Sequence, residues 1–123
     1  MAGDPAIDFT ETHQVIVNVG YGRGPEAAKR LEDNNIICNY QAMPDEEGFT
    51  ASGALRMGVS EMTRFGMGSA DFRELAVLIS DAITKNATVI DQVRRLRARF
   101  CDLQFCFKGE EYEEVLHRMH DLI

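Results

Sequence analysis

The sequence predicts an α+β fold in which a small, mainly antiparallel sheet is covered on one face by helices. Three short apolar runs typical of strands lie in the first half of the chain, and the second half has three stretches with helical spacing of apolar residues. The chain has 123 residues, 45% of them hydrophobic, and a chain of this length buries about two-thirds of its surface on folding. We therefore expect one domain over residues 1–123.

The first half of the chain combines strand and helix signals. Residues 1–13 are polar and unpatterned, so we expect a lead-in rather than an element. The run QVIVNV at residues 14–19 is rich in β-branched side chains and precedes glycines and a proline, which predicts a strand ending in a turn. Pro25 suits the first turn of a helix, and two asparagines end that helix near residue 35. IICN at residues 36–39 predicts the second strand.

A loop and a third strand lead into the remaining helices. Residues 40–50 contain a proline, three consecutive acids and a glycine, which predicts a loop, and residues 54–59 predict the third strand. Ser69 is expected to cap a helix that ends near Asn86. FCF at residues 105–107 fits either a short strand or a buried connection. Two more apolar stripes predict helices, one with Val89, Val93, Leu96 and Phe100 and one with Tyr112, Val115, Leu116, Met119 and Leu122.

The charge and hydropathy of the chain exclude several functions. The formal net charge is −7 at pH 7, and an acidic surface repels the phosphates of nucleic acids. No apolar run approaches the roughly 20 residues that a membrane-spanning helix needs, and the first residues, MAGDPAIDF, lack the pattern of a secretory signal. We expect a cytoplasmic protein that binds neither nucleic acid nor membrane.

The cysteines and histidines do not predict a metal site or a disulfide. The three cysteines, Cys38, Cys101 and Cys106, are odd in number, and we expect reduced thiols. His117 and His120 have a spacing that can bind zinc, but the sequence offers no third ligand nearby. A structural role is the simpler interpretation of both.

The stretch SGALRMGVSEMTRFGM, residues 52–67, places an arginine in an apolar strand between small neighbours. Because side chains alternate along a strand, Leu55 should point under the helices and Arg56 away from them. A guanidinium on a rigid strand can bind a carboxylate through two parallel hydrogen bonds. The alternative is an ordinary solvated arginine, or one paired with Glu61.

This stretch, extended to SGALRMGVSEMTRFGMGSADFRELAVLI, resembles the C-terminal domain of serine hydroxymethyltransferase, also called glycine hydroxymethyltransferase. Three other blocks resemble that domain in the same order: TETHQVIVNV, EAAKRLEDNNIICN and VRRLRARFCDLQFCF. GVSEMTRFGM is closer to the archaeal-type branch than to the bacterial form, which has GTPA where this chain has Gly58 to Glu61. The resemblance covers nearly the whole chain from about Phe9 onward.

The resemblance implies roles for two residues. In that family the arginine of this segment binds the carboxylate of serine or glycine while the amino acid is held on pyridoxal phosphate, and this role falls on Arg56. The family's NxNxxP loop brings its second amide to the pterin of folate. Here that loop starts at Asn39 and has Gln41 in place of the second asparagine, so the amide is kept but is longer.

The resemblance also implies that the cofactor-binding parts of the enzyme lie outside this chain. A pyridoxal-phosphate enzyme needs a lysine that binds the cofactor covalently and a phosphate cradle, whereas Lys29, Lys85 and Lys108 are expected to be solvated cations. We therefore expect no catalytic, cofactor or metal residue in this chain. It would be the C-terminal small domain of a fold-type I pyridoxal-phosphate enzyme, inactive alone. The cofactor-binding large domain would precede residue 1, and the parent would be a homodimer.

Two alternatives remain open from the sequence. The chain could be a stand-alone regulatory module that senses an amino acid through Arg56. It could also be the small domain of a related pyridoxal-phosphate enzyme such as a threonine aldolase, which would differ from hydroxymethyltransferases around Gln41, Ser60 and Glu61.

Overall fold

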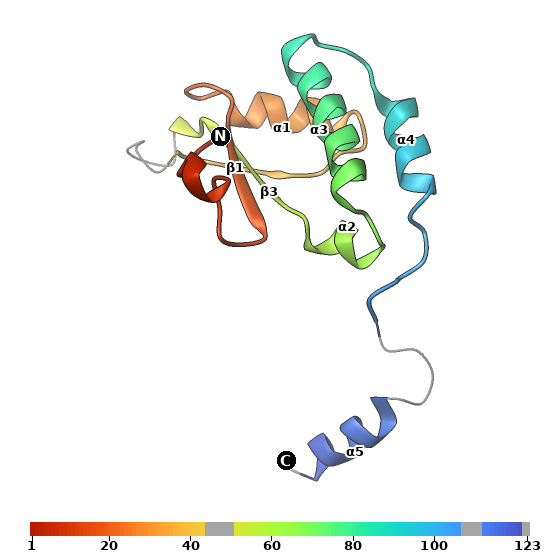
Figure 1. The fold of residues 1–123 in the computed structure, drawn as a ribbon. Helices are drawn as coiled ribbons and strands as arrows, with labels where there is room; N and C mark the ends of the chain where they lie inside the picture. The colour runs from red at the N-terminus through yellow and green to blue at the C-terminus, as the bar shows by residue number, and fades with distance from the viewer. Residues whose placement is uncertain (44–50, 107–111, 122–123) are drawn as a thin grey trace.

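The computed structural model describes residues 1–43, 51–106 and 112–121. Figure 1 shows the arrangement of the elements, which are η1 (Pro5–Ile7), β1 (Gln14–Asn18), α1 (Gly24–Glu32), β2 (Asn39–Gln41), β3 (Ala54–Gly58), α2 (Ser60–Arg64), α3 (Ser69–Thr84), α4 (Ile90–Ala98) and α5 (Glu113–His120).

The sheet is antiparallel throughout, with the order β1-β3-β2. Of the strands that the structure describes, the last in the sequence, β3, is therefore the central one, and it is hydrogen-bonded to a neighbour on each side. Ala2 forms an isolated bridge to Ile16 on the outer edge of β1. This three-stranded antiparallel sheet with helices confirms the predicted fold class.

The core lies between one face of the sheet and the helices. It contains Leu31 from α1, Leu55 from β3, Leu78 from α3, and Val93 and Leu96 from α4. Leu31 and Leu55 are completely buried. Full burial of one such side chain contributes about 1.5–3 kcal/mol relative to leaving it in water. The apolar stripes predicted from the sequence are thus the faces along which these helices pack.

Asparagines end two of the helices, as predicted. Asn35 follows α1 with φ of 63°, and Asn86 follows α3 with φ of 55°. This left-handed conformation is more accessible to asparagine than to most other residues. The predicted cap of α3 was wrong by one residue: Gly68 is the N-cap, and its N–H donates to a carboxylate oxygen of Asp71 at 3.0 Å.

The second strand was predicted in the wrong place. IICN at residues 36–39 was expected to form it, but β2 starts at Asn39 and includes Tyr40 and Gln41, which were assigned to the loop. Ile36 is buried behind α1, where its N–H donates to the carbonyl of Leu31 at 2.9 Å, and Ile37 is 88% exposed. The remaining loop residues from Pro44 to Thr50 lie outside the described part of the chain.

Three smaller features also differ from the sequence prediction. The lead-in contains η1, and α2 follows β3 directly where no helix was expected. Of the FCF run, expected as a short strand or a buried connection, Phe105 and Cys106 form no strand and Phe105 is 68% exposed, so Phe105 fits neither alternative, and Phe107 lies outside the described residues. Beyond the last turn of α4, the guanidinium of Arg99 lies 2.6 Å from a carboxylate oxygen of Glu74 and 3.2 Å from one of Asp71, both near the start of α3. Within the described ranges, no helix is both long and apolar enough to cross a bilayer.

Candidate functional site

The central strand fixes the backbone of Arg56. In the register of the sheet, Arg56 lies opposite Ile16 of β1 and opposite Asn39 of β2. Its neighbour Leu55 is buried in the core, whereas Arg56 is exposed. The two side chains therefore alternate across the sheet as the sequence predicts. Ala54, on the same face as Arg56, is completely buried, so the open part of this face starts at Arg56.

The guanidinium of Arg56 makes no hydrogen bond or ion pair with any residue that the structure describes. Glu61, the acid that the sequence offered as its partner, lies on α2 and is not paired with it. Other arginines differ: Arg30 binds Glu26 at 3.2 Å, and Arg99 binds two acids. The donors of Arg56 are thus available to an anion that comes from outside this chain.

Gln41 lies on the same sheet face as Arg56. It is opposite Ala54, two residues from the pair formed by Asn39 and Arg56. Residues two apart on a strand share a face, and such diagonal neighbours are about 7–8 Å apart. Gln41 and Arg56 also line one cavity of about 720 Å³ at the β2 edge of the sheet. The structure therefore brings together the two residues that the sequence singled out separately.

Asn39 is a candidate that the sequence analysis did not single out. It lies directly opposite Arg56 and lines the same cavity. Its amide can donate and accept hydrogen bonds next to the guanidinium. The signal was present in the sequence, because two amides at positions 39 and 41 share a face once the segment is known to be a strand.

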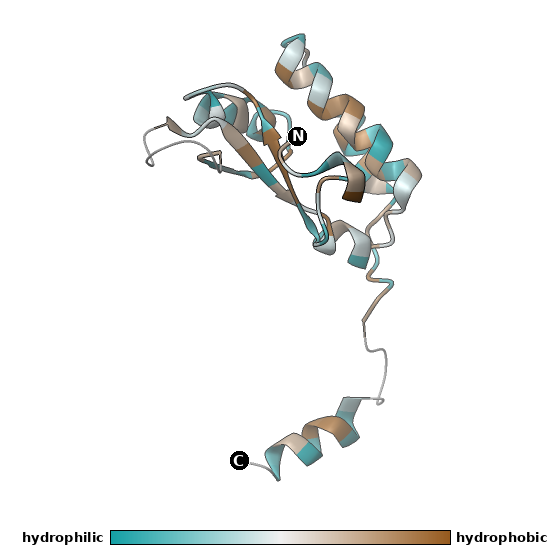
Figure 2. Ribbon diagram, turned by 60° about the vertical axis from the view of Figure 1, so that its left-hand side comes forward, coloured by the Kyte–Doolittle hydropathy of each residue, from teal (hydrophilic) through white to brown (hydrophobic). Residues whose placement is uncertain are grey.

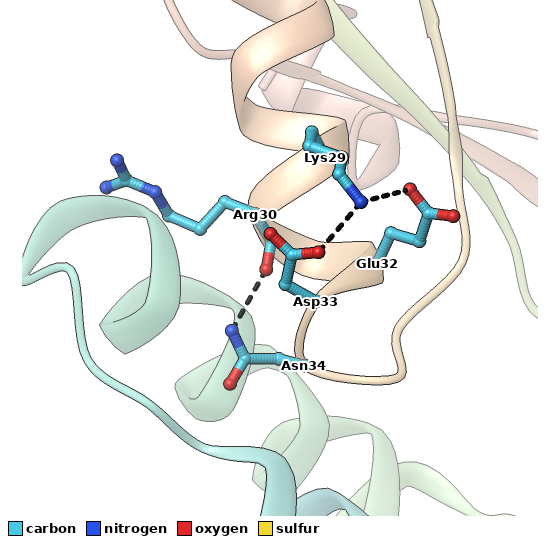
Figure 3. Close-up of polar contacts among 5 residues, drawn as sticks. All are labelled: Lys29, Arg30, Glu32, Asp33 and Asn34. Carbon is cyan, nitrogen blue, oxygen red and sulfur yellow. Dashed lines mark hydrogen bonds and ion pairs between the residues drawn. The ribbon is translucent and has the colours of Figure 1, made fainter.

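Helix α1 forms another wall of this cavity and contributes Lys29. As Figure 3 shows, the ammonium of Lys29 donates to Asp33 at 2.8 Å and to Glu32 at 3.2 Å. These bonds, first to Asp33 and then to Glu32, raise the pKa of Lys29. The lysine is held in its charged form.

The described lysines do not fit covalent attachment of pyridoxal phosphate. A lysine that forms a Schiff base needs a lowered pKa so that it is uncharged and nucleophilic. The acids around Lys29 raise its pKa instead of lowering it. Exposed Lys85 is paired with Asp81 at 2.7 Å. Lys108 lies outside the described residues.

The thiols and histidines contribute no metal site to the described part of the chain. No cluster of three or more His, Cys, Asp or Glu side chains that could hold a metal ion occurs there. Cys38, Cys101 and Cys106 are free thiols. Cys38 packs against the core and lines the cavity, and its burial raises the pKa of its thiol.

The sequence of this chain is similar to those of archaeal serine hydroxymethyltransferases. No family model matches the chain. The serine hydroxymethyltransferase of Pyrobaculum calidifontis is 40% identical over 114 residues, which are 89% of this chain and 26% of that protein. The serine hydroxymethyltransferase of Cenarchaeum symbiosum is 38% identical over 117 residues, which are 87% of this chain and 26% of that protein. The chain thus spans about a quarter of the length of these relatives.

A solved structure has a similar fold. It is the L-threonine transaldolase of Pseudomonas fluorescens, which matches with a TM-score of 0.74 and 27% sequence identity. The match covers 95% of this chain and 28% of the transaldolase. Sequence and fold therefore both relate this chain to about a quarter of a larger enzyme.

Proposed function

Since this chain is homologous to serine hydroxymethyltransferases over most of its own length, we propose that it is the C-terminal small domain of a pyridoxal-phosphate-dependent hydroxymethyltransferase. The whole enzyme transfers a one-carbon unit between serine and a reduced folate or pterin. Its large domain supplies the cofactor, which provides the electron sink for breaking the carbon–carbon bond of serine. A homodimeric parent and a cytoplasmic location belong to the same proposal.

The observation that carries this proposal is the free guanidinium of Arg56 on the central strand. A carboxylate that approaches the open face meets a fork of donors whose backbone is held by β1 and β2. Binding the carboxylate of serine or glycine there fixes the orientation of the amino acid relative to the large domain. Correct orientation of a substrate lowers the entropic part of the activation barrier.

The proposed binding position of the one-carbon carrier is at Gln41. Its amide lies on the same face as Arg56 and on the same cavity. An amide can donate to and accept from the ring edge of a pterin. The two substrates would then meet at neighbouring strands of one sheet.

A chimeric enzyme tests the proposal. In it, this chain replaces the matching quarter of the Pyrobaculum calidifontis enzyme, and serine-to-carrier transfer is measured. Arg56→Ala should lower kcat/KM for serine by about 100-fold or more, because a charged pair loses one partner. Arg56→Lys should give a smaller loss, since a lysine keeps the charge without the fork. Arg94→Ala, on an exposed arginine of α4, is the control and should leave the rate unchanged. Equal activity of the Arg56→Ala and unsubstituted chimeras would refute the role of Arg56.

Ligand binding by the isolated chain distinguishes a domain of a larger enzyme from a stand-alone amino-acid sensor. Calorimetric titration with glycine and with serine should give no heat of binding, because the rest of the composite site is elsewhere. Binding at millimolar or lower concentrations would instead favour a stand-alone regulatory module.

A second reaction is favoured by the fold match to L-threonine transaldolase. The same chimera can be assayed with threonine and an aldehyde acceptor in place of serine and the carrier. If Gln41 contacts a pterin, Gln41→Asn should change KM for the carrier and leave KM for serine unaltered. Activity with threonine alone, and none with serine, would assign the domain to the related enzyme class.

A further inference from the structure

The strand residues around Arg56 on the open face of the sheet are all uncharged. Cross-strand partners share a face, and so do residues two apart on one strand. In Figure 2 the strands carry both hydrophilic and hydrophobic colours, as expected when one face is open and the other covers the core. The chain has 20 acidic residues, yet none occupies a neighbouring position on this face of the described strands. These positions are held by Gln14, Ile16 and Asn18 of β1, Ala54 and Gly58 of β3, and Asn39 and Gln41 of β2.

Asn39 is the polar residue directly opposite Arg56 in this register. The Cβ atoms of such partners are about 4.5–5.5 Å apart, so the side chain at position 39 lies within reach of the guanidinium. On the other side the partner is apolar Ile16. An acid at position 39 would pair with Arg56, as Glu26 pairs with Arg30 on α1. The uncharged amide of Asn39 does not neutralise the guanidinium.

The acid on the facing wall of the cavity is held away from Arg56. Of the described residues that line this cavity, Glu32 of α1 is the only acid. Its carboxylate lies 3.2 Å from the ammonium of Lys29, which stays charged because its pKa is raised. The positive charge of Arg56 is therefore not compensated from the strand beside it or from the helix across the cavity.

We propose that Asn39 is a specificity-determining residue of the Arg56 site: its neutral amide leaves the guanidinium without an internal partner, so that a carboxylate from outside the chain takes that position. The inference rests on the proposed function, because it concerns the carboxylate that Arg56 binds there. An external carboxylate then has no acid of the chain to displace. Selectivity of this kind depends on the absence of a competing group as well as on the attractive one.

An NMR titration of the full chain tests the arrangement without the rest of an enzyme. In Asn39→Asp, the introduced carboxyl group should have a pKa about one pH unit below its value in the double variant Asn39→Asp/Arg56→Met, because a nearby guanidinium favours the ionised form. Gln92→Glu, on exposed α4, is the control, and its introduced carboxyl group should titrate identically with and without Arg56→Met. Equal pKa values for the carboxyl group at position 39 in the single and double variants would overturn the inference.

The chimera with the Pyrobaculum calidifontis enzyme provides the functional measurement. A difference of one pH unit corresponds to a ten-fold preference, so Asn39→Asp should raise KM for serine about ten-fold. The value of kcat should stay nearly constant, because saturating serine displaces the internal carboxylate. Asn39→Ala removes the amide without adding a charge, and it should raise KM far less. Equal losses in the two variants would indicate a structural role for Asn39 and overturn the inference.

Failure of this inference can be distinguished from failure of the proposed function. If Arg56→Ala leaves the activity of the chimera unchanged, both are refuted. If Arg56→Ala lowers kcat/KM for serine as expected but Asn39→Asp leaves KM unaltered, only the role of Asn39 is refuted.

Discussion

At the scale of single residues, the sequence predicted the exposure of Arg56 but not all of its neighbours in the candidate site. Strand alternation correctly predicted that Leu55 would be buried and that Arg56 would be exposed. The sequence could not predict that Gln41 lies on the same face, because this depends on the register between β2 and β3. Register is set by pairing between distant segments, which a local pattern does not contain. Asn39 was overlooked for a different reason: residues 40 and 41 were assigned to a loop, so the face that Asn39 shares with Gln41 was not recognised.

Cys38 gives a prediction about pH at this scale. Burial raises the pKa of its thiol above the ordinary value of 9.0, so the unfolded chain loses this proton at lower pH than the folded chain. The contribution of Cys38 to stability is complete below the unfolded pKa, and it is lost as pH rises through the folded pKa. We expect the free energy of unfolding to fall more steeply as pH rises above the ordinary thiol pKa in the unsubstituted chain than in Cys38→Ala.

Urea denaturation at several pH values measures this difference. Cys101→Ala is the matched control, because Cys101 is exposed, and it should keep the pH dependence of the unsubstituted chain. Identical pH profiles for Cys38→Ala and the unsubstituted chain would contradict the assignment.

At the scale of elements, the sequence predicted the long helices better than the short segments. The stripes of α3 and α4 repeat over several turns, so their faces could be identified without knowledge of their partners. Ile36 and Ile37 have strong strand propensity, yet Ile36 packs behind α1 and Ile37 is exposed, because tertiary packing outweighs propensity in short runs. The five-residue helix α2 has too few residues to show a periodic pattern.

Asn34 joins two elements and provides a stability prediction. Its Nδ2 donates to the carbonyl of Arg30 at 2.9 Å, as Figure 3 shows, and its Oδ1 accepts from the N–H of Val89 at 2.6 Å. This buried amide thus links the end of α1 to the start of α4. Asn34→Ala should destabilise the chain by about 1–3 kcal/mol, because it leaves the N–H of Val89 without its acceptor.

Denaturant unfolding measures the effect of this substitution. Asn34→Asp keeps the acceptor and should recover part of the loss. Gln92→Ala, at an exposed position of α4, should change stability by less than about 0.5 kcal/mol. A loss below about 0.5 kcal/mol in Asn34→Ala would show that the link contributes little.

At the scale of the whole molecule, the core and the candidate site lie in the part built from the sheet and helices α1 to α4. Helix α5 adds no buried residue to it. The sequence predicted the helix and its stripe, but not that the stripe would be uncovered, since periodicity shows which face is apolar and not what covers it.

Removal of residues 112–123 tests whether α5 contributes to the stability of the part that contains the core. The truncated chain should unfold with a free energy within about 0.5 kcal/mol of the full chain. Leu96→Ala, which truncates a buried core residue, should cost about 2–5 kcal/mol in the same assay. A loss above about 2 kcal/mol on truncation would mean that α5 packs on the rest of the chain.

The position of β3 between β1 and β2 has a mechanical consequence. Hydrogen bonds on both sides join Arg56 and Gln41 into one rigid unit. If this sheet swings relative to the rest of an enzyme, both groups swing with it through the same angle. A distant substitution that changes the resting angle of the domain would therefore alter together the affinities for the two ligands that we propose for Arg56 and Gln41.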